Sequence, residues 1–287
     1  MNRKPFRLFL GLTMLLAASR AGAVPTTNGL YAVFNTSKGT FYCNLRYDLV
    51  PRTVANFVGL VEGSKTWLDY SKSALANRPF YTGLTFHRVV PGFVIQGGSP
   101  NGNGNDDPGY QFRNEINAAL NHNSAGTLAM ANAGGTNSNG SQFYVTLAPQ
   151  PSLNGNYTVF GGVVEGMPVV STIGTVATDA NQKPLVPVVM NSVSILRIGT
   201  AAANFNIAAV SPALPVPHFK AAEVLRQPGH YALSWSFLAN NDYRVCYTAD
   251  TKSWQGAYLG PYSGVFVDNF VASSPSQFFV VVESKVD

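Results

Sequence analysis

Short runs in which apolar and polar residues alternate occupy much of the chain up to residue 198, and this period of two residues is typical of β-strands. Segments rich in glycine, asparagine, serine and proline separate the runs, as expected for turns. On this pattern we expect eight strands, at residues 29–36, 40–46, 84–88, 93–97, 126–131, 142–147, 159–164 and 188–198. The first two enclose Ser37-Lys38-Gly39 and are expected to form a hairpin.

Two segments have helical spacing instead. After Pro51, apolar residues recur at positions i, i+3, i+4 and i+7, and Gly63 follows as a stop signal. A second, shorter helix is expected at residues 168–176. Between the first helix and the third strand, Trp67 and Tyr70 lie in a connecting excursion and are expected to cover the main fold.

Many short strands with only two helices favour a mainly β domain at residues 24–198. We expect a closed antiparallel eight-stranded barrel, because closure leaves no strand edge unpaired. The composition then changes, and residues 199–217, rich first in alanine and then in proline, predict a semi-rigid linker. Beyond the linker, β-like runs at 231–237, 243–247, 264–267 and 277–282 predict a small all-β, sandwich-like domain at residues 218–287.

The first 23 residues have the pattern of a secretory signal peptide. Arg3, Lys4 and Arg7 precede a short apolar run, and Ala21-Gly22-Ala23 matches a cleavage site, so cleavage is expected after Ala23. The alternative, a membrane anchor, is disfavoured because the apolar run is too short to span a bilayer. We therefore expect an exported protein without a membrane span, in the periplasm or, alternatively, outside the cell.

The charge balance argues against nucleic acid as a partner. The chain has 19 basic and 14 acidic residues, but four of the basic ones lie in residues 1–23. The mature chain is therefore nearly neutral and has no basic stripe of the kind that binds nucleic acid.

Cys43 and Cys246 are the two cysteines. An oxidising compartment would permit a disulfide between them, but they lie in different predicted domains, and two unpaired strand cysteines are the preferred interpretation. Because no C-x-x-C pair or cysteine–histidine cluster occurs, neither a metal site nor a cofactor is predicted.

Candidate chemistry is concentrated in the segments F-H-R-V-V-P-G-F-V-I-Q-G-G at 86–98 and M-A-N-A through G-S-Q-F at 130–143. Arg88 and Gln96 are eight positions apart across a Pro-Gly turn, so paired strands would place both on one face. With Phe93 and the amides of Asn132 and Gln142, they suggest a polar, peptide-binding groove beside an apolar pocket. A hydrolase is not indicated, because these segments contain neither a G-x-S-x-G elbow nor a thiol.

These two segments, with L-N-G-N-Y-T-V-F-G at 153–161, resemble the signature blocks of the cyclophilin family of peptidyl-prolyl cis-trans isomerases. The resemblance covers about residues 30–198, in order. It implies a cyclophilin-like barrel that accelerates rotation about X–Pro peptide bonds in proline-containing peptides and, given the predicted export, in unfolded exported proteins.

The resemblance also implies roles for individual residues. Arg88 would be the catalytic arginine, Phe93 would form the floor of the proline pocket, and Gln96 and Asn132 would hold the substrate backbone, Asn132 through main-chain groups. His87 is interpreted as a packed residue, because the reaction moves no proton. The remaining substrate-binding residues would be Val94, Ala131, Gln142, Tyr144, Leu153 and Tyr157.

Several positions depart from the family pattern. Ser152 stands where a tryptophan is frequent, and Tyr157, Tyr144 and Val94 replace a histidine, a phenylalanine and a methionine. Because Ser152 removes a large apolar surface and an indole donor, we expect weak binding of the cyclic peptide cyclosporin. These departures leave open a chaperone that binds proline peptides with little turnover. A surface-attached module is a third possibility, because residues 243–254 resemble a pattern of small β modules at the ends of exported bacterial proteins.

Overall fold

The computed structural model describes residues 23–72, 74–135, 138–210, 214–227, 230–236, 238, 241–248, 255–261, 266–268 and 278–285. All but the last residue of the predicted signal peptide lies outside this part of the chain.

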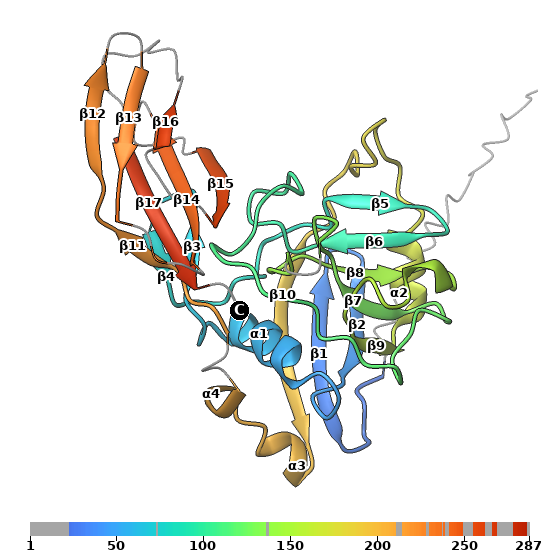
Figure 1. The fold of residues 1–287 in the computed structure, drawn as a ribbon. Coiled ribbons are helices and arrows are strands. Elements are labelled where there is room, and N and C mark those ends of the chain that lie inside the picture. The colour runs from blue at the N-terminus through green and yellow to red at the C-terminus, as the bar shows by residue number, and fades with distance from the viewer. Residues whose placement is uncertain are drawn as a thin grey trace, which may run out of the picture.

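An antiparallel eight-stranded sheet forms the larger part of the molecule (Figure 1). Its strands follow the order β10-β1-β2-β9-β7-β8-β6-β5. Their bounds are β1 (Gly29–Thr36), β2 (Gly39–Leu45), β5 (Arg88–Val90), β6 (Val94–Gly97), β7 (Thr127–Met130), β8 (Phe143–Thr146), β9 (Val159–Glu165) and β10 (Met190–Ile198). Seven of the eight expected strands are present with ends shifted by at most two residues, whereas the strand expected at 84–88 shares only Arg88 with β5.

The sheet is curled, and the closed barrel that we expected is not confirmed. Its two edge strands are β5 and β10. Because β5 begins only at Arg88, the residues 84–87 that the pattern assigned to a strand form no ladder. They meet the segment before β10 through the isolated bridge Thr85–Val189 and the hydrogen bond from Phe86 N to Val188 O (3.0 Å).

The concave side of the sheet encloses an aromatic core. Phe34 and Phe41, which are register partners on β1 and β2, stack with centroids 4.7 Å apart. Phe143 from β8 and Phe57 from helix α1 (Pro51–Glu62) pack against Phe34. The predicted helix stripe is therefore core, and α1 ends at Gly63, whose φ of 73° is left-handed and suits a residue without a side chain. The second predicted helix is α2 (Met167–Ile173).

The excursion after α1 forms a small hairpin of β3 (Trp67–Asp69) and β4 (Ala74–Ala76). Trp67 packs edge-on against Phe80 at 4.9 Å and joins the main core, as expected. Tyr70 does not: it packs with Leu68 against Cys246 and Val282 from the C-terminal strands. Its hydroxyl donates to Asp107 Oδ1 of the large sheet domain at 3.3 Å, so the expectation for Tyr70 is met in part, while its apolar neighbours come from a part of the chain that local pattern does not place.

The described parts of the predicted linker, residues 199–210 and 214–217, include helical structure. They contain the short helices α3 (Thr200–Ala203) and α4 (Ile207–Val210). Phe205 lies 5.2 Å from the ring of Tyr47, and Leu214 is buried in the main core. Lys65 Nζ donates to Pro215 O at 2.6 Å. At these described residues the segment packs against the large sheet domain.

In the described residues of the C-terminal region, the regular secondary structure is β-strand. It contains β11 (His218–Lys220), β12 (Glu223–Gln227), β13 (His230–Ser234), β14 (Asn241–Thr248), β15 (Gln255–Pro261), β16 (Phe266–Asp268) and β17 (Phe278–Lys285), of which β11, β12 and β15 were not expected. They form the sheets β11-β17-β14-β15 and β12-β13-β16. Leu233 of the second sheet clusters with Tyr243, Val245 and Val281 of the first. The sandwich-like arrangement stays a prediction.

Two further expectations concern the thiols and the membrane. Cys43 in β2 and Cys246 in β14 are both buried and free, in agreement with the preferred interpretation. Burial raises the pKa of both thiols, that of Cys246 to about 12. Within the described part of the chain, no helix has the length and apolar character needed to cross a membrane.

Candidate active site

Strand register places three of the predicted site residues, Arg88, Gln96 and Tyr144, in one row across the sheet. Arg88 pairs with Gln96, Gln96 with Tyr144, and Tyr144 with Ala129, so four adjacent strands contribute one residue each. Their neighbours Val89, Ile95, Val145 and Leu128 are buried in the core. Because successive side chains of a strand point to opposite faces, the row lies on the convex face. The alternation that builds the core thus also assembles the site.

The guanidinium of Arg88 is held from two sides. Its Nε donates to Gln182 Oε1 at 2.7 Å, and its Nη1 donates to Gln96 Oε1 at 3.3 Å. Gln182 also accepts a backbone hydrogen bond from Val89 N at 2.8 Å. Among the described residues Gln182 alone combines a side chain with a positive φ, of 65°. Sequence analysis missed it, because it lies 94 positions from Arg88 and in no motif.

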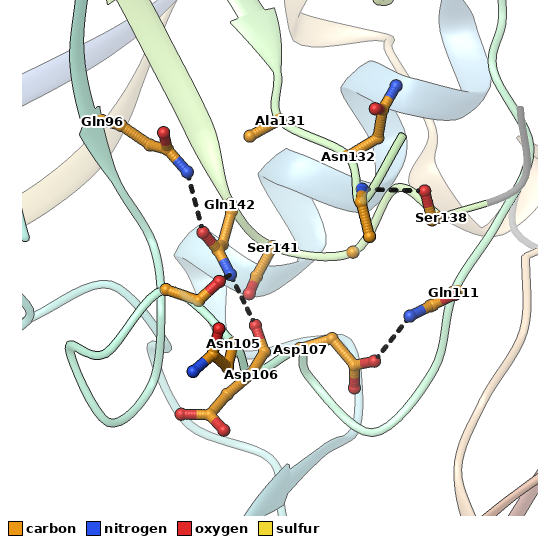
Figure 2. A pocket seen from close by; sticks show the side chains of 13 residues that line it. Gln96, Asn105, Asp106, Asp107, Gln111, Ala131, Asn132, Ser138, Ser141 and Gln142 are labelled. Carbon is orange, nitrogen blue, oxygen red and sulfur yellow. Dashed lines mark hydrogen bonds between the residues drawn. The ribbon is translucent and has the colours of Figure 1, made fainter. Parts of the chain in front are cut away.

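A relay of amides continues from Arg88 along the groove (Figure 2). Gln96 Nε2 donates to Gln142 Oε1 at 3.0 Å, and Gln142 Nε2 donates to the carbonyl oxygens of Gly104 and Asp106, both at 2.8 Å. Each amide is therefore fixed in orientation, since its oxygen accepts and its nitrogen donates. The oxygen of Gln96 faces the arginine as a result.

This relay borders a polar cavity of about 320 Å³. Four predicted residues, Gln96, Ala131, Asn132 and Gln142, line it together. Asp106, Asp107 and Gln111, which sequence analysis did not select as site residues, also line this cavity (Figure 2). The structure thus brings these four predicted residues together and adds two acidic residues to the lining of the cavity.

The side chain of Asn132 is engaged locally. Its Nδ2 donates to Asn156 O at 3.1 Å, and its Oδ1 accepts from Gly134 N at 3.1 Å. Contact of Asn132 with a substrate through main-chain groups stays a prediction.

The predicted pocket residues form one apolar cluster. Val94, Ala129, Tyr144 and Val159 are its buried members, and Phe93, Leu120, Ala131, Leu153 and Tyr157 are half-buried against them. The rings of Tyr144 and Tyr157 meet edge-on at 5.8 Å. Because the half-buried side chains keep exposed surface, this cluster offers apolar and aromatic area to a bound ring.

The hydroxyl of Tyr144 is bound to a buried histidine that sequence analysis missed. His122 N and Nδ1 approach Asn154 Oδ1 at 2.7 and 3.1 Å, and His122 Nε2 lies 2.8 Å from Tyr144 Oη. Since the amide oxygen accepts, Nδ1 carries the proton and Nε2 accepts from the tyrosine. Burial lowers the pKa of His122 and raises that of Tyr144, so both stay neutral.

His87, next to the arginine, is buried. Burial, and secondarily the positive charges of Arg88 and Lys183, lowers its pKa from 6.5 to about 4. It is thus a neutral packed residue at physiological pH, as expected. Within the described residues, no group of His, Cys, Asp and Glu side chains is arranged to hold a metal ion.

Comparison with known proteins decides the family. The family model described as cyclophilin type peptidyl-prolyl cis-trans isomerase/CLD matches residues 31–195, which is more than half of the chain. The chain belongs to the cyclophilin-type isomerases. Its activity is that of a peptidyl-prolyl cis-trans isomerase, and the matched residues include all eight strands of the curled sheet in whole or in part.

Named relatives and solved structures match similar shares of this isomerase. Probable peptidyl-prolyl cis-trans isomerase A of Mycobacterium leprae is 45% identical over 166 residues, which cover 57% of this chain and 91% of the relative. Peptidyl-prolyl cis-trans isomerase CYP18-2 of Arabidopsis thaliana is 42% identical over 165 residues, covering 56% and 88%. A Cryptosporidium parvum cyclophilin solved in the presence of the dipeptide Ala-Pro matches with a TM-score of 0.51 at 28% identity, covering 58% of this chain and 99% of its own. The C-terminal strands lie beyond the residues that the family model matches.

Proposed function

We propose that Arg88 is the catalytic residue of this isomerase and acts by stabilising the twisted X–Pro amide. The barrier to rotation is about 18–20 kcal/mol and arises from amide resonance. When the bond twists, the prolyl nitrogen loses that resonance and gains a lone pair that accepts a hydrogen bond. A donor aimed at this nitrogen favours the twisted state over both planar isomers, which is what acceleration requires.

The observation that carries the proposal is the anchoring of the guanidinium at the edge of the apolar cluster. Gln182 and Gln96 hold two of its N–H groups at 2.7 and 3.3 Å, and Gln96 is the register neighbour of Tyr144. A planar fork held at one side still presents its remaining donors in a fixed direction. A lysine would supply charge without this geometry.

Substrate binding would divide between the two parts of the site. The proline ring would rest on Phe93 and Tyr144, with Val94, Leu153 and Tyr157 around it, because these side chains form one apolar cluster. The peptide backbone would follow Gln96, Ala131, Asn132 and Gln142 along the polar cavity.

Isomerisation of an Ala-Pro test peptide by the full chain tests the role of Arg88. We expect Arg88→Ala to lower kcat/KM by about 100- to 1000-fold, the range for loss of a charge-stabilising donor. Arg197→Ala is the matched control, because Arg197 pairs with Glu62 on β10 and α1, away from the site. Equal rates for wild type and Arg88→Ala would refute the catalytic role. Absence of turnover in both would favour the proline-binding chaperone that Val94, Tyr144 and Ser152 leave open.

We further propose that this isomerase assists the folding of exported proteins, in the periplasm or, alternatively, outside the cell. The proposal is supported by the signal pattern of residues 1–23 and by the slowness of uncatalysed X–Pro rotation, which takes about 10–100 s and limits folding. Fractionation of cells that express the full chain tests it. We expect a processed protein beginning at Val24, and an unprocessed cytoplasmic protein would contradict it.

A further inference from the structure

A buried arginine of the C-terminal region reaches the loop that walls the polar cavity. Arg244 in β14 is 1% exposed. Its Nη2 donates to Asp107 Oδ2 at 2.7 Å, and its Nη1 donates to Gly109 O at 3.0 Å. A buried charge is costly unless it is paired and hydrogen-bonded, so this contact commits the C-terminal region to one place on the loop.

Asp107 organises the loop around that contact. Its Oδ1 accepts from Gly109 N at 2.8 Å and from the hydroxyl of Tyr70 at 3.3 Å, and its Oδ2 accepts from Gln111 Nε2 at 3.1 Å. The carboxylate thus ties both sides of the turn at residues 107–111 to the arginine. Asp107 and Gln111 are themselves lining residues of the cavity (Figure 2).

The turn is also clamped sterically. Gly109 has φ of 91°, and a Cβ there would lie 2.6 Å from Leu68 Cβ and 3.2 Å from Pro217 Cβ. Leu68 and Tyr70 pack in turn against Cys246 and Val282 of the C-terminal sheet. The loop is therefore enclosed by β3, by the segment that enters β11 and by β14.

From this loop, hydrogen bonds lead directly to the substrate side. The carbonyl of Asp106, next to Asp107 in the chain, accepts from Gln142 Nε2 at 2.8 Å. Gln142 accepts from Gln96, and Gln96 accepts from Arg88. A displacement of the loop therefore removes acceptors from Gln142 first.

We propose that Arg244 is a positioning residue for the isomerase site: through Asp107 it holds the wall on which Gln142 orients, so the C-terminal region completes the substrate groove. The inference rests on the proposed role of this groove in binding the peptide backbone. Arg88 keeps its direct bond to Gln182, so loss of Arg244 weakens substrate binding and leaves the rotation step intact. This pattern corresponds to a higher KM with unchanged kcat.

Steady-state kinetics of full-length Arg244→Met and Asp107→Asn test the proposal. We expect KM for the Ala-Pro peptide to rise about threefold to tenfold in both, the range for residues that act through a contact network, with kcat unchanged. Lys220→Met is the matched control, because it also removes a positive charge from the C-terminal region. The partner of Lys220 is Glu283, at 3.5 Å, and not the loop that contains Asp107. The KM of Lys220→Met should equal that of the wild type.

The NMR signals of the Gln142 side-chain amide give a second measurement. They should move in Arg244→Met and Asp107→Asn and stay in place in Lys220→Met.

If circular dichroism shows that Arg244→Met has lost its fold, the kinetics of Asp107→Asn, which changes the other side of the contact, decide. An unchanged KM in a folded variant overturns the inference, and so does a fall in kcat alone. Failure of the proposed function is distinguishable, because it would appear as equal rates for wild type and Arg88→Ala.

Discussion

At the scale of single residues, the site depends on a strained glutamine. Gln182 adopts φ of 65° and directs its amide at the guanidinium of Arg88. A left-handed conformation of a residue with a side chain costs about 1 kcal/mol or more, and such strain is found where surrounding contacts hold it for function. The residue with the strained backbone, Gln182, is therefore also the one whose side chain orients the guanidinium of Arg88.

The substitution Gln182→Gly should separate the cost of the left-handed backbone at this position from the contribution of the Gln182 side chain to orienting Arg88. We expect the free energy of unfolding to stay equal or rise, because glycine adopts this φ freely, although it also adds backbone entropy to the unfolded chain. We expect kcat/KM to fall about threefold to tenfold, because Arg88 loses its shortest hydrogen bond. Urea unfolding and the Ala-Pro assay measure the two quantities. Gln182→Asn, which tolerates this φ but is one methylene shorter, should be as slow, and full activity in both variants would contradict the role.

Ser152 is a second position at which we expect one side chain to set a property of the site, the affinity for cyclosporin. It is exposed beside Leu153, a member of the apolar cluster, and stands where a tryptophan is frequent in the family. We expect weak binding of cyclosporin by the wild type and about tenfold tighter binding by Ser152→Trp, because the indole adds apolar area and a donor. Calorimetric titration measures both. Submicromolar affinity of the wild type would be contrary to this expectation.

At the scale of elements, helix α1 obtains its N-terminal cap from a distant loop. Val50, at the cap position, makes no side-chain cap hydrogen bond. Glu115 replaces it: its Oε2 accepts from Thr53 N at 2.8 Å and from Thr53 Oγ1 at 2.9 Å, and its Oε1 accepts from Arg52 N at 3.2 Å. A carboxylate at a helix N-terminus both satisfies free N–H groups and interacts favourably with the helix dipole.

Glu115→Ala should therefore destabilise the domain without touching the groove. We expect the free energy of unfolding to fall by about 1–2 kcal/mol, as for loss of a cap, with kcat/KM unchanged. Glu115→Gln keeps an acceptor but loses the charge, and its loss should be smaller. Thermal unfolding of the three proteins provides the measurement, and equal stability of wild type and Glu115→Ala would show that the contact contributes nothing.

At the scale of the whole molecule, burial of His87 makes stability depend on pH. The folded-state pKa of about 4 lies below the ordinary 6.5, so the unfolded chain binds this proton first as the pH falls. The stability is fully present above pH 6.5 and is lost as the pH falls toward 4. A difference of this size corresponds to about 3 kcal/mol.

The pH dependence of unfolding in urea tests this prediction. The wild type should lose about 3 kcal/mol more than His87→Gln between pH 6.5 and 4. The comparison with the variant removes the contributions of carboxylates and of His122, which titrate in both proteins. Parallel pH curves for the two proteins would contradict the assignment to His87.

Much of the fold and site followed from local pattern. Alternation with period two predicts a strand wherever one face is buried, and the Pro91-Gly92 turn sets the register that pairs Arg88 with Gln96. The same period separates Ile95, in the core, from Gln96, in the groove. The motifs then bring Phe93 and Tyr144 into one cluster, as expected.

What the sequence alone determined is therefore most strands of the large sheet, the first helix and the residues whose spacing along a strand places them on one face. The tertiary structure decided which distant groups meet: Gln182 with Arg88, Glu115 with α1, and Arg244 with Asp107, separated by 94, 62 and 137 positions. The physical reason is the separation along the chain over which each feature is set. Side-chain direction repeats every two residues in a strand and can be read locally, whereas contacts between distant segments depend on how the sheet curls and where the C-terminal strands dock.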